Sequence, residues 1–167
     1  MNSYEIKHAL LSYFRYNRQC ICATECFNND VMVITKNRIT IDVEVKVSKY
    51  DLWKGEARKL KHKGYKREQY NKNYYANKFY ICVPSELLEE AKKWVEATNH
   101  KYGIIQCLRR SLLPHNIFIE KSALLLHKVK SETLANKIMM RVCSENIGLI
   151  TDKLVNLKEE GIIDNNE

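Results

Sequence analysis

The sequence predicts an α/β fold in which a mixed β-sheet core is flanked by helices and followed by a C-terminal helical extension. Apolar residues at helical spacing open the chain over residues 3–15. Strand-like runs follow over residues 18–47, and a strand–helix–strand series, typical of parallel neighbouring strands, occupies residues 78–108. These three observations predict a sheet that combines antiparallel and parallel strands.

The N-terminal part is expected to form one helix and three antiparallel strands. Ser3 can cap the helix, and Asn28-Asn29 is typical of a tight turn after a first strand over residues 18–27. The next two strands flank Lys36-Asn37-Arg38, so we expect these three residues to form a hairpin loop.

The rest of the chain alternates helices and strands. Its elements are expected at residues 51–63 (a helix ended by Gly64), 78–83 (a strand), 85–98 (a helix capped by Ser85), 103–108 (a strand), 117–126 (a candidate edge strand) and 131–160 (a helical region). Gly148 is a point at which the last helical region could bend. The predicted organisation is a domain over residues 1–126, a helical extension over 127–160 and a tail over 161–167. The extension either packs on the sheet or pairs with a second chain, which would make a homodimer.

The 167-residue chain has a soluble globular composition and a formal net charge of +8. A basic protein favours polyanionic partners, among which nucleic acid is the commonest. No apolar run approaches the ~20 residues of a membrane span, and the N-terminal segment lacks the pattern of a secretory signal. We therefore expect a cytoplasmic protein with no membrane partner.

The six cysteines contain no Cys-x-x-Cys pair and lie mostly in apolar, strand-like runs. This placement favours reduced thiols in the core over a structural zinc or iron–sulfur site.

The hairpin carries a candidate metal site. In its second strand apolar residues alternate with Thr40, Asp42, Glu44 and Lys46, so the last two project from one face. If Thr35 faces Ile39 across the loop, Asp30 lies opposite Glu44, with the roots of the two side chains ~5 Å apart. Two carboxylates that close repel one another unless a cation lies between them, and Mg²⁺ prefers such oxygen ligands.

A segment rich in Lys, Arg and Tyr follows the hairpin, over residues 48–75. Lysine and arginine can neutralise phosphates, and tyrosine rings can stack on bases or sugars. The basic residues and tyrosines expected to contact nucleic acid are Lys54, Arg58, Lys61, His62, Tyr65, Lys66 and Arg67, with Tyr70, Tyr74 and Tyr75 interleaved. The alternative is a solvated helix face whose tyrosines close the edge of the core.

Asp30 and the Glu44-Val45-Lys46 triplet resemble the PD-(D/E)XK nuclease superfamily, in which a helix precedes strands that carry Asp and then Glu-x-Lys. The series VEVKVSKYDL, KHKGY, NKFYICVP, YGIIQCL and EKSALLLH is similar to the MmcB-like branch of DNA repair nucleases. The resemblance covers roughly residues 5–126.

The resemblance implies a restriction-endonuclease-like core and a metal-dependent DNA endonuclease, selective for a branch, nick or flap. Asp30, Glu44 and the Val45 carbonyl would hold Mg²⁺ or Mn²⁺. Lys46 would orient the attacking water or assist its deprotonation. Glu5, which falls where many members place a further acid, or Glu25 would complete the site; a surface acid near a helix N-terminus is the alternative for Glu5.

The resemblance also implies accessory or DNA-contacting roles for Asp51, Lys61, His62 and Tyr65. Two further interpretations remain beside the nuclease. The fold could serve as a catalytically inactive module that binds DNA or a protein partner. Thr40, Asp42, Glu44 and Lys46 could also be no more than the solvent-exposed face of an antiparallel sheet.

Overall fold

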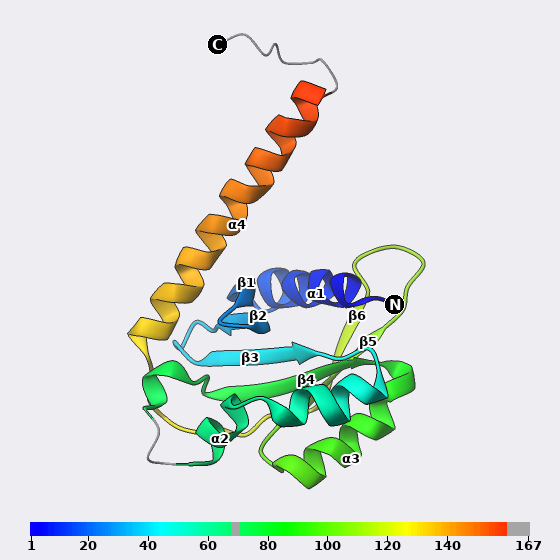
Figure 1. Cartoon of the computed structure of the whole chain (residues 1–167), viewed down its shortest axis with the longest axis vertical. Coiled ribbons are helices and arrows are strands. Elements are labelled where there is room, and N and C mark those ends of the chain that lie inside the picture. Colours follow the sequence, from blue (N-terminus) through cyan, green and yellow to red (C-terminus); the bar gives the residue numbers. More distant parts are fainter. Residues whose placement is uncertain (68–70, 160–167) are drawn as a thin grey trace.

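A computed structural model describes residues 1–67 and 71–159 and contains a six-stranded mixed sheet flanked by helices (Figure 1). The strands are β1 (Ile21–Cys26), β2 (Asn29–Ile34), β3 (Thr40–Val45), β4 (Lys78–Pro84), β5 (Gly103–Leu108) and β6 (Asn116–Lys121). They lie side by side in chain order. The pairs β1–β2, β2–β3 and β5–β6 are antiparallel, whereas β3–β4 and β4–β5 are parallel. The predicted α/β class, with its mixed sheet, is confirmed.

The longer helices are α1 (Ser3–Ser12), α3 (Leu88–Thr98) and α4 (Glu132–Glu159), and α2 (Lys61–Lys66) is a short one. The cap of α1 is Asn2 and not the predicted Ser3, because the Asn2 side chain accepts from the Glu5 N–H while the Glu5 carboxylate accepts from the Asn2 N–H. The first β-turn is also shifted by one residue. Phe27 and Asn28 both have positive φ and join the pair Cys26–Asn29.

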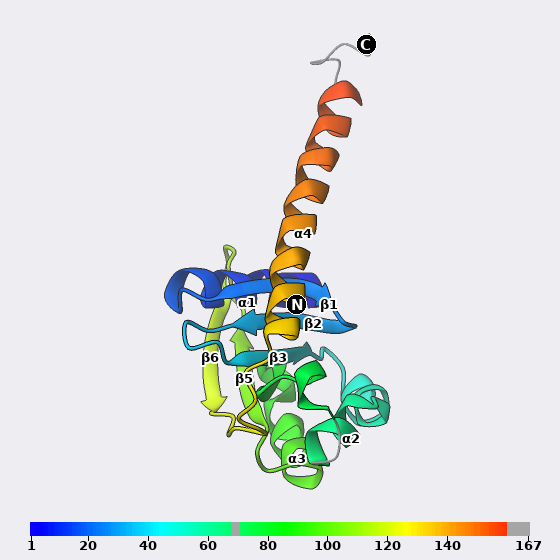
Figure 2. The ribbon, with the colours of Figure 1, turned by 90° about the vertical axis from the view of Figure 1, so that its left-hand side faces the viewer.

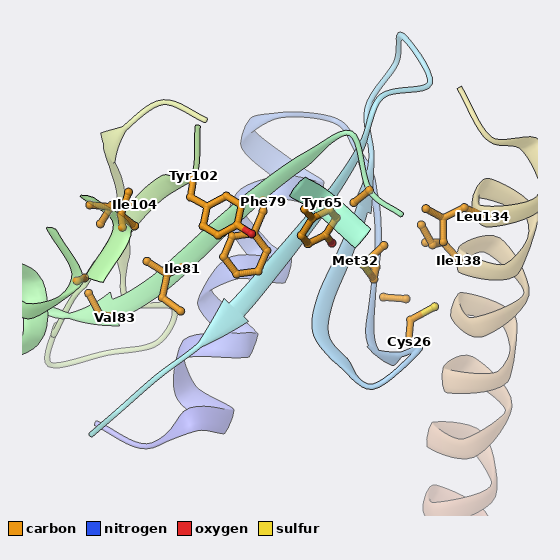
Figure 3. Close-up of a cluster of buried hydrophobic side chains, with 14 of the residues drawn as sticks. Cys26, Met32, Tyr65, Phe79, Ile81, Val83, Tyr102, Ile104, Leu134 and Ile138 are labelled. Atoms are coloured by element: carbon orange, nitrogen blue, oxygen red, sulfur yellow. The ribbon is translucent and has the colours of Figure 1, made fainter. Parts of the chain in front are cut away.

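The sheet has a hydrophobic core on each face. On one face, α1 buries Ile6 and Leu10, and the turn that follows it (Tyr13–Asn17) buries Phe14, against residues of β2, β3, β4 and β5. On the other face, α3 packs on β4 and β5, and the start of α4 packs on β1 and β2. Figure 3 shows Tyr65, Phe79 and Tyr102 side by side in this core. The centroids of the Phe79 and Tyr102 rings are 4.5 Å apart. Two-sided burial explains the near-continuous apolar sequences of β4 and β5.

The predicted helix over residues 51–63 is wrong in its form. Residues 51–66, called the cover segment below, form a π-helical turn (Asp51–Gly55), a 3₁₀ turn (Glu56–Arg58) and then α2. Lys59 is extended, with ψ of 128°, and separates the two halves. Gly64 lies inside α2 and does not end it; a Cβ at this position would come within 2.1 Å of the Tyr75 ring.

Helix α4 starts in the core and then leaves the sheet (Figures 1 and 2). Ser131 caps it, and its first turns bury Leu134 and Ile138. Further along, Glu145 accepts a hydrogen bond of 2.8 Å from the Thr24 N–H, and Arg141 donates to the Thr24 carbonyl at 3.0 Å. These contacts satisfy backbone groups of the edge strand β1.

The helical extension predicted from residue 127 is therefore partly core, and only its distal half stands free. Ile147 and Ile150 are 66% and 61% exposed, and the helix runs through Gly148 without a break. None of the helices in the described part of the chain has the length and apolarity needed to cross a membrane. The tail at 161–167 lies outside the described residues.

Alanine substitutions of two isoleucines test whether the first part of α4 belongs to the core while its distal half does not. Ile138→Ala is expected to lower the free energy of unfolding by roughly 2–5 kcal/mol, because the Ile138 side chain is fully buried. Ile147→Ala is expected to change it by no more than ~0.5 kcal/mol, since that side chain already lies in solvent. Urea unfolding of both variants checks the prediction, and equal effects would contradict the division.

Candidate functional site

The register predicted for the hairpin is confirmed. The Thr35 N–H donates to the Ile39 carbonyl at 2.9 Å, and Val31 pairs with Val43. One step further, the Asp30 carboxylate accepts a hydrogen bond of 2.8 Å from the Val45 N–H. A side chain thus takes the place of the β2 backbone beside Val45. Because the N–H and C=O of a strand residue point to the same side, the Val45 carbonyl faces the same gap.

The polar face of β3 is buried, so its interpretation as a solvent-exposed face is wrong. Asp42 and Glu44 have no exposed surface, and Lys46 is 5% exposed. The cover segment lies over this face and supplies the groups that pair with it. Such burial is costly for charged groups unless each is paired.

Three acids and three lysines form one network, called the carboxylate–lysine cluster below; its members are Asp42, Glu44, Glu56, Lys46, Lys59 and Lys61. Glu44 is central, since its two oxygens contact the ammonium groups of Lys59 and Lys61. Lys61 also reaches Asp42 at 2.9 Å. Lys46 lies 3.2 Å from Glu56 and 3.6 Å from Glu44.

Glu56 is a member that the sequence reasoning missed. It is fully buried and contacts Lys46, Lys59 at 3.1 Å and the Nε2 atom of His62 at 2.9 Å. The sequence does contain a signal for its burial. Glu56 follows the apolar residue Leu52 by four positions, and this spacing places both side chains on the same face of a helix.

Two residues expected to contact DNA are buried supports. His62 lies between Glu56 and the Tyr102 hydroxyl, which is 2.7 Å from Nδ1. The Tyr65 hydroxyl donates to Asp42 at 2.7 Å. The two side chains are buried and order the carboxylates, as an accessory role implies, and contact with DNA at these positions stays a prediction.

The other residues predicted to contact nucleic acid differ in how exposed they are. Lys61 is largely buried in the cluster, whereas Lys54, Arg58, Lys66 and Arg67 are exposed. Tyr74 is also exposed and Tyr75 is half-buried; Tyr70 lies outside the described residues. The solvated part of the basic segment is therefore the outer face of the cover segment.

Asp30 is linked to α1 through a lysine. Lys7 lies 2.9 Å from Asp30 and also contacts Glu25, so Glu25 lies beside the predicted site. Asp51 joins from the other side, 3.3 Å from Lys46. Glu5 is not brought to the site: its carboxylate caps α1, as the surface-acid alternative states. The sequence reasoning did not single out Lys7.

The pKa values of the acids in the site are shifted in different directions. Burial, reinforced by the charge of Asp42, raises the pKa of Glu44 to about 7 despite the neighbouring lysines. Burial also opposes ionisation of Asp30, but hydrogen bonds from Lys7 and Val45 outweigh it and hold the pKa of Asp30 below its usual value. In the same way His62 and Lys61 overcome burial at Glu56 and lower its pKa. Glu44 is therefore the acid that titrates near neutral pH.

The donor set offers a limited fit to a divalent cation. Within residues 1–67 and 71–159, no three Asp, Glu, His or Cys side chains converge to hold a metal by themselves. A metal would rest on Asp30, Glu44 and the Val45 carbonyl, with water completing its shell. Asp42 Oδ1 is buried and makes no hydrogen bond within the described structure, so the cluster has an unused oxygen. Lys59 would have to release Glu44.

Glu44→Gln tests the raised pKa. Between pH 4.5 and about 7 the unfolded chain loses the Glu44 proton while the folded chain keeps it. The free energy of unfolding of the native protein therefore falls across this window relative to the variant, which cannot ionise, by about 3 kcal/mol.

Urea titrations of both proteins in metal-free buffer across this pH range measure the difference. Glu86→Gln, at an exposed acid outside the cluster, is the matched control. A difference between native protein and Glu44→Gln that stays constant with pH would contradict the assignment.

Comparisons with known proteins inform the fold alone. No protein-family model and no curated protein sequence matches the chain. Among solved structures, the SPO1766 protein of unknown function from Silicibacter pomeroyi is similar, with a TM-score of 0.60 and 11% sequence identity. The match covers 100% of this chain and 98% of that chain, so the similarity in fold extends over α4 as well as the sheet.

Proposed function

We propose that this protein is a metal-dependent endonuclease that hydrolyses phosphodiester bonds in DNA. The observation that carries the proposal is the gap beside Val45, which brings the Asp30 carboxylate next to the strand that presents Glu44 and Lys46. An acid, a second acid and a lysine at the end of two diverging strands supply the groups that hydrolysis of a phosphodiester needs.

Asp30, Glu44 and the Val45 carbonyl would hold Mg²⁺ or Mn²⁺, as the resemblance to the PD-(D/E)XK nucleases implies. Such an ion, when bound, lowers the pKa of a water ligand and stabilises negative charge on the phosphoryl oxygens. The Val45 N–H fixes the orientation of the Asp30 carboxylate before any ion binds.

Lys46 would orient the attacking water. Its ammonium is almost fully buried and lies within 3.6 Å of three acids: Glu44, Asp51 and Glu56. Glu56 is in turn oriented by His62, and His62 by Tyr102. This chain of contacts limits the positions that the ammonium can take, and a fixed position is what general acid–base catalysis needs.

Charge on the outer surface supports a nucleic-acid substrate. Lys54, Arg58, Lys63 and Lys66 are exposed on the cover segment, Arg67 is exposed directly after it, and the whole chain carries +8. Exposed lysines and arginines can contact the phosphates on both sides of the bond that is cut.

One observation favours the alternative of an inactive binding module. Lys59 and Lys61 already neutralise Glu44, so the cluster has charge balance without a metal. A protein of this kind would bind DNA through the same basic surface and would not cleave it.

Cleavage of a DNA panel tests the proposal. Single-stranded, duplex, nicked and branched DNA with Mg²⁺ or Mn²⁺ are the substrates. We expect at least one to be cleaved, and expect Asp30→Asn, Glu44→Gln and Lys46→Met each to reduce the rate by about 100-fold or more. The Asp30→Asn side chain can still accept from Val45, and Lys46→Met keeps the volume, so circular dichroism should stay unchanged. Absence of cleavage in the whole panel would overturn the proposal.

Metal binding separates the two functions. If Asp30 and Glu44 hold the ion, Mn²⁺ at 100 times its dissociation constant should raise the free energy of unfolding by about 2.7 kcal/mol, and Asp30→Asn should abolish this gain. Thermal unfolding with and without Mn²⁺ measures it. The binding module predicts no gain and DNA binding that withstands both EDTA and Asp30→Asn.

A further inference from the structure

A groove of about 340 Å³ lies beside the carboxylate–lysine cluster. The β1–β2 turn, the residues around Lys59 and Lys61, and the start of α4 at Leu134 line it. Lys61 connects the groove with the cluster, because it lines the groove and also contacts Glu44. A ligand in this groove would lie next to the proposed catalytic residues.

Two exposed aromatic rings stand in the wall of the groove. Phe27 and Tyr74 are 44% and 59% exposed, and both line it. The Lys137 ammonium of α4 lies over both rings, 4.7 Å from the centroid of Phe27 and 5.7 Å from that of Tyr74. The centroids of the two rings are therefore at most about 10 Å apart, so both rings belong to one wall of the groove.

The backbone at Phe27 supplies an independent observation. Phe27 has φ of 58°, in the left-handed region that favours Gly and Asn. A bulky residue in that region costs roughly 1–2 kcal/mol, and Phe27 is 44% exposed, so burial of its side chain is incomplete compensation. An exposed aromatic residue in a strained turn points to a role in binding.

The charges around the groove indicate what it binds. Lys59 and Lys61 line it while also pairing with acids of the carboxylate–lysine cluster, and Lys137 lies at the aromatic rings. No acidic side chain is among the described residues of its lining. Flat aromatic faces combined with ammonium groups suit a base together with its phosphate. A base within a duplex is already stacked on both sides, so only an unpaired base could pack on these rings.

We propose that this groove binds an unpaired nucleotide of single-stranded DNA, with its base against Phe27 and Tyr74 and its phosphate toward Lys59 and Lys61. The role of the groove in cleavage rests on the proposed nuclease function, but the binding step does not. A strand held in this way enters the cluster from an unpaired end, which makes single-stranded DNA or a flap the substrate class.

Binding of a short fluorescent oligothymidylate in EDTA, followed by anisotropy, tests the groove. Phe27→Gly and Tyr74→Ala are each expected to weaken binding by about tenfold, and Tyr74→Phe to keep it, because that variant retains the aromatic face. Tyr16→Ala, at a tyrosine that is 79% exposed outside the groove, is the matched control and should leave binding unchanged. A blunt duplex should be bound equally by all variants.

Thermal unfolding of Phe27→Gly shows whether weaker DNA binding comes from the loss of a binding contact or from a less stable fold. Glycine relieves the left-handed strain, so we expect stability to be equal or higher while binding is lost. The proposal is overturned if Phe27→Gly and Tyr74→Ala bind oligothymidylate within twofold of Tyr16→Ala, or if duplex binding falls as much as single-strand binding. Because EDTA prevents metal-dependent cleavage, loss of binding in a protein that cuts no DNA would support the groove and reject only the nuclease.

Discussion

The burial of three carboxylates under one face of the sheet is the constraint on which the surrounding structure depends. Asp42, Glu44 and Glu56 are all removed from water, and an unpaired buried carboxylate would be far too costly for a domain of this size. Each therefore needs a cation or hydrogen-bond donors close by. The chain meets this need with Lys61, which contacts all three acids, together with Lys46 and Lys59.

This requirement explains the irregular course of the cover segment. A continuous helix over residues 51–63 would direct its successive lysines around the helix axis, and few could reach one strand. The extended backbone at Lys59 breaks the helix and allows Lys59 and Lys61 to reach Glu44 from the same side. Local helix propensity is given up so that buried charges are paired, which is a tertiary effect.

The parts predicted from the sequence are those governed by short-range geometry. The alternation in β3 and the length of the hairpin loop define the register, so the position of Asp30 relative to Glu44 follows from counting. Burial of β3 was not predictable in the same way, because Lys59 and Lys61 look like solvent-exposed residues until a partner acid is known. The capping role of Glu5 shows the same limit: its residue type suits a metal site, but its neighbour Asn2 already uses it.

The lysines also constrain how the cluster could ever hold a metal. Three acids and three lysines are balanced, so a divalent ion, which adds two positive charges, would disturb that balance unless ammonium groups left the cluster. Lys59 is the member able to leave, because its side chain is 33% exposed, compared with 13% for Lys61 and 6% for Lys46. Lys59 also lines the groove, so a phosphate bound there could pair with its ammonium group. The ion would release Lys59 from Glu44, and the phosphate of the DNA strand would pair with the released ammonium group. Binding of the ion and binding of the strand would therefore favour one another.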